Sequence, residues 1–144
     1  MAEGRILLVE DQREWQVELK NLLQDYPYSI RVADSLQRAS DLLKDHVFDL
    51  VLLDLRLNDW EEGNFGGWEL MDRLKACREE QGTQVIINSA YGEPHHVREG
   101  FKKYHIADYI DKRRLDPRDF QESVADAIEK AYEERGETLD RRKS

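Results

Sequence analysis

The chain of 144 residues has a single cysteine, three prolines and no apolar run long enough to cross a membrane. A spanning helix takes about 20 apolar residues, whereas the longest apolar runs are 6–9 and 50–53. Cys77 has no partner for an internal disulfide, which is typical of a reducing compartment. The N-terminus lacks an apolar segment followed by a cleavage site. We therefore expect a cytoplasmic protein with no membrane contact and no secretory leader.

Positive charge is also scarce. The chain has 22 lysines and arginines against 31 aspartates and glutamates, and its formal net charge is −9. A surface of this sign repels phosphate backbones, so we expect no nucleic acid to bind this domain. Carboxylates gathered at one place, in contrast, hold hard cations. The acidity therefore disfavours nucleic acid as a partner and is compatible with a metal site.

Short apolar runs alternate along the chain with segments of helical spacing, and these runs are 5–9, 30–33, 48–53, 85–88 and 107–110. The segments between them carry apolar stripes, namely Trp15, Leu19, Leu22, Leu23 and Tyr26; Leu36, Ala39, Leu42 and Leu43; Leu70, Met71, Leu74 and Cys77; Val97, Phe101 and Tyr104; and Phe120, Val124, Ile128 and Ala131. Five strands alternating with five helices predict an α/β domain with a parallel sheet. We expect this domain to span 1–132, and the charged residues 133–144 to be a frayed helix end or a linker stub.

Individual residues mark the limits of several predicted helices. Pro27 closes the first helix, and Ser35 is a plausible N-cap of the second. Pro94 lies near the start of the fourth helix. The fifth has Asp116 as its cap and Pro117 at its first position, where a missing N–H costs nothing.

Polar side chains follow four of the predicted strands. Glu10 and Asp11 follow the first strand, Asp54 the third, Ser89 and Ala90 the fourth, and Asp111 and Lys112 the fifth. Ligands of open α/β sheets bind at the carboxyl ends of the strands. Clustered carboxylates repel one another unless a cation balances them, and oxygen ligands of this charge suit Mg²⁺ or Mn²⁺.

Each of these residues also has an ordinary structural interpretation. Asp11 could be a helix cap, Lys112 a solvated turn residue, and Ser89 a partner of the local backbone. Taken singly, each ordinary interpretation is favoured. Their joint occurrence at one edge of one sheet favours a functional site.

The sequence resembles the receiver domain of two-component response regulators. The matching segments are ILLVED, FDLVLLDL, INSAY and ADYIDK, together with SLQRASDLL before the second of them. The resemblance covers about residues 4–132 and implies a three-layer, doubly wound, flavodoxin-like fold. Its sheet would have five parallel strands in the order 2-1-3-4-5, with five helices.

The resemblance implies roles for the polar residues. Asp54 would accept a phosphoryl group from a histidine kinase or a phosphotransfer protein. Mg²⁺ or Mn²⁺ would be held by Glu10, Asp11, Asp54 and the backbone carbonyl of Arg56. Lys112 would contact the phosphoryl oxygens, Ser89 would hydrogen-bond the group after transfer, and the small Ala90 would leave room for it.

Three further positions follow from the same resemblance. Tyr109 matches the aromatic switch position, although an aromatic residue in a strand is also ordinary packing. Arg56 and Tyr91 lie two residues beyond Asp54 and Ser89, where side chains influence the lifetime of the phosphorylated state. The resemblance also implies a downstream protein or effector domain as a partner.

The chain departs from the family pattern in two places. Arg113 replaces the proline that normally follows the conserved lysine, so we expect a trans peptide and an altered loop path. The loop 58–67 is long and carries Asp59, Glu61 and Glu62. It has three interpretations: a solvated insertion, a lid, or a partner contact through Trp60 and Phe65.

The leading functional hypothesis is a phosphorylation-switched signalling domain that is not a turnover enzyme, although it could dephosphorylate itself. The chain would be either a natural single-domain regulator or a fragment of a longer one. One alternative is a pseudo-receiver, a binding module that is never phosphorylated. A less favoured one is a phosphohydrolase with an Asp nucleophile, whose second Asp would stand where this chain has Arg56.

Overall fold

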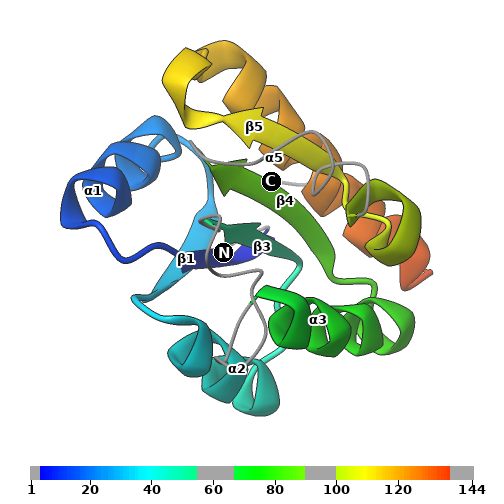
Figure 1. Cartoon of the computed structure of the whole chain (residues 1–144). Helices are drawn as coiled ribbons and strands as arrows, with labels where there is room; N and C mark the ends of the chain where they lie inside the picture. Colours follow the sequence, from blue (N-terminus) through cyan, green and yellow to red (C-terminus); the bar gives the residue numbers. More distant parts are fainter. Residues whose placement is uncertain (1–3, 55–66, 90–99, 137–144) are drawn as a thin grey trace.

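The computed structural model describes residues 4–54, 67–89 and 100–136 (Figure 1). The strands are β1 (Gly4–Val9), β2 (Tyr28–Ala33), β3 (Leu50–Leu53), β4 (Gln84–Ser89) and β5 (Asp108–Asp111). The helices are α1 (Arg13–Leu22), α2 (Leu36–Asp45), α3 (Gly67–Gln81) and α5 (Pro117–Glu134), with short turns η2 (Gly100–Tyr104) and η3 (Lys112–Arg114). Among these described helices, none has the length and apolar character to cross a membrane.

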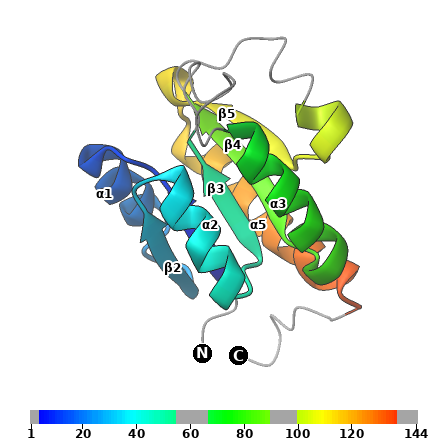
Figure 2. The same cartoon turned by 60° about the horizontal axis from the view of Figure 1, so that its bottom comes forward.

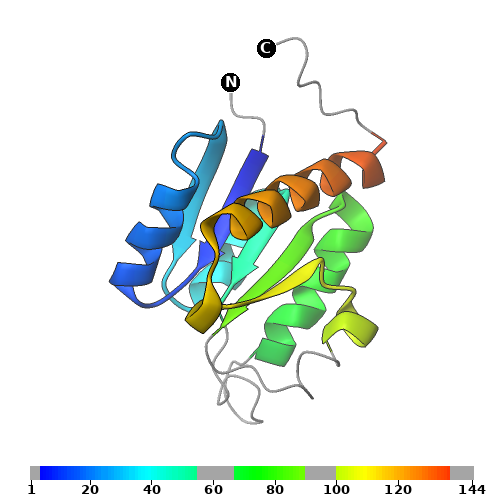
Figure 3. The same ribbon diagram turned by 90° about the horizontal axis from the view of Figure 1, so that it is seen from above.

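The five strands form one parallel sheet in the order β2-β1-β3-β4-β5. Helices α1 and α5 cover one face and α2 and α3 the other (Figures 2 and 3). This arrangement confirms the predicted three-layer, doubly wound, flavodoxin-like fold and its strand order. Because all the strands run the same way, their carboxyl ends meet at one edge of the sheet.

The core is divided by the sheet into two clusters, because successive side chains of a strand point to opposite faces. On the α2–α3 face, Leu7 and Val9 of β1 pack with Leu74 of α3. On the α1–α5 face, Ile6 and Leu8 pack with residues of α1 and α5. In β3, Val51 and Leu53 pack on the α2–α3 face and Leu50 and Leu52 on the other, so both strands are buried on both faces, as expected in a parallel sheet covered by helices.

Helix limits agree with most of the local signals. The Ser35 hydroxyl accepts a hydrogen bond from the Arg38 N–H at 3.0 Å, and Asp116 accepts one from the Asp119 N–H at 3.1 Å. Helix α1 ends earlier than its stripe predicted, because Tyr26 lies beyond Leu22 and stacks on Tyr28 instead.

The predicted fourth helix is described only in its last part. Gly100–Tyr104 forms a single π-helical turn, and Tyr104 is buried against the α3 side of the core. Pro94 and Val97 lie outside the described residues. At the other end of the fold, α5 runs two residues past Tyr132, and the Arg135 guanidinium pairs with the buried Asp49 at 2.7 Å. Residues 137–144 lie outside the described ranges.

Candidate functional site

Three carboxylates meet at the carboxyl edge of the sheet. Glu10 and Asp11 follow β1 and Asp54 follows β3, the neighbouring strand. One oxygen from each carboxylate can be chosen so that all three lie within 4.8 Å of one another. These are hard oxygen donors at a spacing that suits one divalent cation, so the residues present fit Mg²⁺ or Mn²⁺.

Glu10 is held rigidly on the inner side of this cluster. It is 1% exposed, and its Oε2 accepts a hydrogen bond from the Gln12 N–H at 3.1 Å. Its other oxygen, Oε1, accepts one from the Lys112 ammonium. Gln12 is also the N-cap position of α1, so Asp11 is not the cap residue of that helix.

Lys112 supplies the positive charge of the cluster. Its ammonium nitrogen lies 3.2 Å from Asp54 Oδ1 and also pairs with Glu10. The residue is 7% exposed, which overturns its interpretation as a solvated turn residue. Its ammonium also lies 4.9 Å from the centre of the Trp15 ring, within the range of a cation–π contact.

The loop after β5 brings Lys112 to the site without the proline. Among the described residues no peptide bond is cis, so the Lys112–Arg113 peptide is trans as predicted. Residues 112–114 form a 3₁₀ turn capped by Asp111, whose Oδ1 accepts a hydrogen bond from the Arg113 N–H at 2.9 Å. The Arg113 guanidinium pairs with the same carboxylate at 2.9 Å. This local pairing fixes the turn that starts at Lys112.

Asp54 titrates abnormally in this setting. Burial raises its pKa from an ordinary 3.8 to about 7; the Lys112 ammonium opposes this rise, and the Glu10 carboxylate adds to it. Between pH 3.8 and about pH 7, Asp54 keeps its proton in the folded state but has lost it in the unfolded state. The stability contributed by Asp54 therefore falls as pH rises through this window and is lost above about pH 7.

Asp54→Asn is accordingly expected to stabilise the metal-free domain. The increase in the free energy of unfolding, relative to wild type, should be larger near pH 8 than near pH 5, with a difference of about 2 to 3 kcal/mol. Denaturant unfolding in EDTA at the two pH values measures it. Asp25→Asn, at an exposed position, is the matched control and should change stability little at either pH. Equal gains for Asp54→Asn at both pH values would contradict the raised pKa.

The structure also brings Ser89 at the carboxyl end of β4 and Tyr109 of β5 together. Ser89 is the last residue of β4 and is 1% exposed. The Tyr109 hydroxyl donates a long hydrogen bond of 3.4 Å to the Ser89 carbonyl oxygen. The partly buried Tyr109 side chain also packs against the core on the α2–α3 face, so it has a structural role besides its hydrogen bond to Ser89.

Several predicted positions cannot be placed in this site. Ala90, Arg56 and Tyr91 lie outside the described residues, as do Trp60, Phe65 and residues 58–66 of the long loop. Cys77 is described: it is 9% exposed and packs in the core from α3, as predicted. Its pKa is raised, chiefly by burial.

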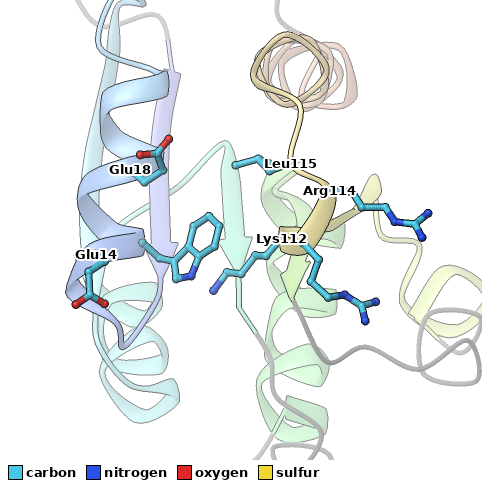
Figure 4. A pocket seen from close by; sticks show the side chains of 7 residues that line it. Glu14, Glu18, Lys112, Arg114 and Leu115 are labelled. Atoms are coloured by element: carbon cyan, nitrogen blue, oxygen red, sulfur yellow. The ribbon is translucent and has the colours of Figure 1, made fainter.

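A groove opens beside Lys112 between α1 and the turn η3 (Figure 4). It has a volume of about 490 Å³ and is lined by Glu14, Trp15, Glu18, Lys112, Arg113, Arg114 and Leu115. The sequence assigned Trp15 only to an apolar stripe, and the structure adds its contact with the Lys112 ammonium. Its place in the first turn of α1 puts Trp15 near the carboxyl edge of the sheet, but the sequence carries no signal for its contact with Lys112.

Comparison with known proteins gives consistent similarities. A family model described as the response regulator receiver domain matches residues 6–125. The transcriptional regulatory protein CpxR of Escherichia coli K12 is 39% identical over 89 residues, which are 62% of this chain and 34% of CpxR. The alginate biosynthesis transcriptional regulatory protein AlgB of Pseudomonas putida is 44% identical over 57 residues, which are 40% of this chain and 13% of AlgB.

Among solved structures, the signal receiver domain of a putative LuxO repressor protein from Vibrio parahaemolyticus is similar in fold. It superposes with a TM-score of 0.77 at 24% identity, covering 92% of this chain and 95% of that chain. The matches to CpxR and AlgB thus cover about a third or less of those longer proteins, whereas the LuxO domain is matched almost completely.

Proposed function

Because the chain belongs to the response regulator receiver domain family of two-component systems, we propose that it accepts a phosphoryl group on Asp54. One observation carries the proposal. The Asp54 carboxylate lies 3.2 Å from the Lys112 ammonium, and one of its oxygens is within 4.8 Å of an oxygen of Glu10 and one of Asp11. The arrangement combines a nucleophile, a fixed positive charge and ligands for a cation.

The donor is a phosphohistidine of a histidine kinase or a phosphotransfer protein. A carboxylate oxygen of ionised Asp54 forms a bond to phosphorus while the bond from phosphorus to the imidazole nitrogen breaks, and the imidazole leaves. Charge on the equatorial oxygens has to be neutralised during transfer. Lys112 supplies an ammonium for this, and the buried Ser89 hydroxyl donates a hydrogen bond to the transferred group.

Glu10, Asp11 and Asp54 would hold Mg²⁺ or Mn²⁺, together with the backbone carbonyl of Arg56. When bound, the cation supplies further positive charge to the phosphoryl oxygens. It would also favour the ionised form of Asp54, which the metal-free site disfavours.

Phosphorylation then acts as a switch. Lys112 and Ser89 are drawn to the new phosphoryl group, and Tyr109, whose hydroxyl reaches the Ser89 carbonyl, responds to the shift of that strand end. The readout is a change in the protein-interaction surface around β5 and α5, recognised by a downstream protein or effector domain.

The test is incubation of the chain with Mg²⁺ and acetyl phosphate, followed by intact mass. We expect retention of one phosphoryl group, and no adduct in EDTA. An unmodified chain under conditions that phosphorylate a known receiver would favour the pseudo-receiver instead. Rapid multiple turnover of small phosphate esters would favour the phosphohydrolase.

Asp11→Asn is expected to weaken Mg²⁺ binding by roughly tenfold or more, because it removes one of three charged ligands. Asp11 is exposed, so its replacement should leave the metal-free fold intact. Isothermal titration with Mg²⁺ measures the change, and the rise in melting temperature with added Mg²⁺ should shrink in parallel. Unchanged Mg²⁺ affinity in this variant would exclude Asp11 as a ligand.

A further inference from the structure

Asn88, at the carboxyl end of β4, is a buried amide that has no hydrogen-bond partner among the described residues. The residue is 1% exposed, and within the described part of the chain neither its Oδ1 nor its Nδ2 has a partner. Buried polar groups in native proteins are nearly always satisfied, because an unpaired one has lost its bonds to water. An unpaired amide at this position therefore points to a partner that arrives in another state of the site.

The sheet register places Asn88 next to Asp54. Leu53, the last residue of β3, pairs with Ile87 of β4, so the residues that follow them, Asp54 and Asn88, lie at the same level of the sheet. In the same way Val9 pairs with Leu53, so Glu10 lies beside Asp54. Neighbouring strands are about 4.8 Å apart. Glu10, Asp54 and Asn88 thus occupy consecutive strands at the same level of the sheet.

The three side chains also share one face. Ile86 packs on the α1–α5 face while Val85 and Ile87 pack on the other, so alternation puts Asn88 on the α1–α5 face. Leu8 and Leu52 lie on the α1–α5 face as well, and Glu10 and Asp54 continue their alternation. The carboxamide is therefore beside the two carboxylates on the side of the sheet where they lie.

Lys112 reaches these carboxylates across β4. Asn88 pairs with Ile110 of β5, and Lys112 is two residues further along on the same face. The strands lie in the order β1-β3-β4-β5. Lys112 follows β5, and its ammonium contacts Asp54, which follows β3, and Glu10, which follows β1. Its side chain has to cross the end of β4, where Asn88 lies.

The metal-free pairing of Lys112 competes with a bound cation. In the metal-free structure Glu10 and Asp54 form ion pairs with the Lys112 ammonium. The same two carboxylates form the candidate cation site with Asp11. A divalent cation at this site repels the Lys112 ammonium and coordinates carboxylate oxygens of Glu10 and Asp54 that otherwise accept its hydrogen bonds. The displaced ammonium then needs another acceptor, and Asn88 Oδ1 is a buried one on its path.

We propose that Asn88 is a positioning residue for Lys112, whose ammonium donates a hydrogen bond to the Asn88 Oδ1 atom when a divalent cation engages Glu10 and Asp54. This inference rests on the proposed function, because it requires that the carboxylates bind the cation. It assigns Asn88 the task of keeping the ammonium beside Asp54, ready for the phosphoryl oxygens, instead of letting it leave the site.

The matched pair Asn88→Val and Asn88→Thr tests this. Valine and threonine have the same shape and both suit a strand, so their difference reports the oxygen acceptor. We expect Asn88→Val to bind Mg²⁺ about tenfold more weakly than wild type in isothermal titration without a phosphodonor. Asn88→Thr should bind within about threefold of wild type. Melting in EDTA should show Asn88→Val at least as stable as wild type, since it removes an unpaired buried amide.

The outcomes separate the two proposals. Wild-type Mg²⁺ affinity in Asn88→Val overturns the role of Asn88 alone, and so does equal weakening in both variants, which would indicate packing. A wild-type chain that binds no Mg²⁺ overturns both this inference and the proposed cation site. Phosphorylation by acetyl phosphate should follow the Mg²⁺ affinities, slowed in Asn88→Val and retained in Asn88→Thr.

Discussion

Replacing Lys112 by methionine is expected to lower the free energy of unfolding of the metal-free domain by about 3 kcal/mol. The Lys112 ammonium pairs with both Glu10 and Asp54, and the side chains of all three residues are at most 8% exposed. Methionine fills a similar volume but leaves the buried Glu10 carboxylate, and Asp54 wherever it is ionised, without a counterion. Removing one partner of a buried ion pair is costly, because the remaining charge has neither water nor counterion.

The stability lost in Lys112→Met should be restored by Mg²⁺. Saturating Mg²⁺ should recover most of the lost stability, since the cation replaces the missing positive charge between the carboxylates. Lys75→Met, at an exposed position of α3, is the matched control and should change stability little with or without Mg²⁺. Denaturant unfolding in EDTA and in Mg²⁺ measures both. Wild-type stability of Lys112→Met in EDTA would show that the ammonium does not balance these carboxylates.

Asp54→Asn is expected to abolish retention of the phosphoryl group from acetyl phosphate. A neutral amide offers no ionised oxygen to attack phosphorus, and it also removes a charged ligand of the cation. The variant should remain folded, because the metal-free protein is predicted to gain stability from the exchange. Asp25→Asn should take up the phosphoryl group as wild type does. Equal uptake by Asp54→Asn would place the acceptor at another residue.

The strands and the polar residues at their ends were predictable because both depend on local pattern. Continuous apolar runs give buried strands, and parallel strands bring their carboxyl ends to one edge whatever the loops do. Glu10, Asp11 and Asp54 therefore meet where the sequence placed them. Ser35 and Asp116 cap their helices because capping needs only a side-chain oxygen at the right spacing.

The reach of Lys112 was not predictable from pattern. It depends on the path of a loop without its usual proline, in which Asp111 caps the turn and pairs with Arg113. The contact of Trp15 with Lys112 needs the relative placement of α1 and η3, which no local spacing contains. The sequence places Asn88 only at the end of the predicted strand 85–88, and its position level with Asp54 follows from the register of β3 and β4.

The most direct measurement of the central claim locates the phosphoryl group on the chain. Borohydride reduces an acyl phosphate to an alcohol, so treatment of the phosphorylated chain converts the acceptor aspartate to homoserine. Peptide mass mapping then identifies the position. We predict conversion of Asp54 alone, dependent on Mg²⁺ and on acetyl phosphate. Conversion of a different carboxylate, or a phosphoryl group that borohydride leaves intact on a hydroxyl such as that of Ser89, would contradict the assignment of Asp54 as the phosphoacceptor.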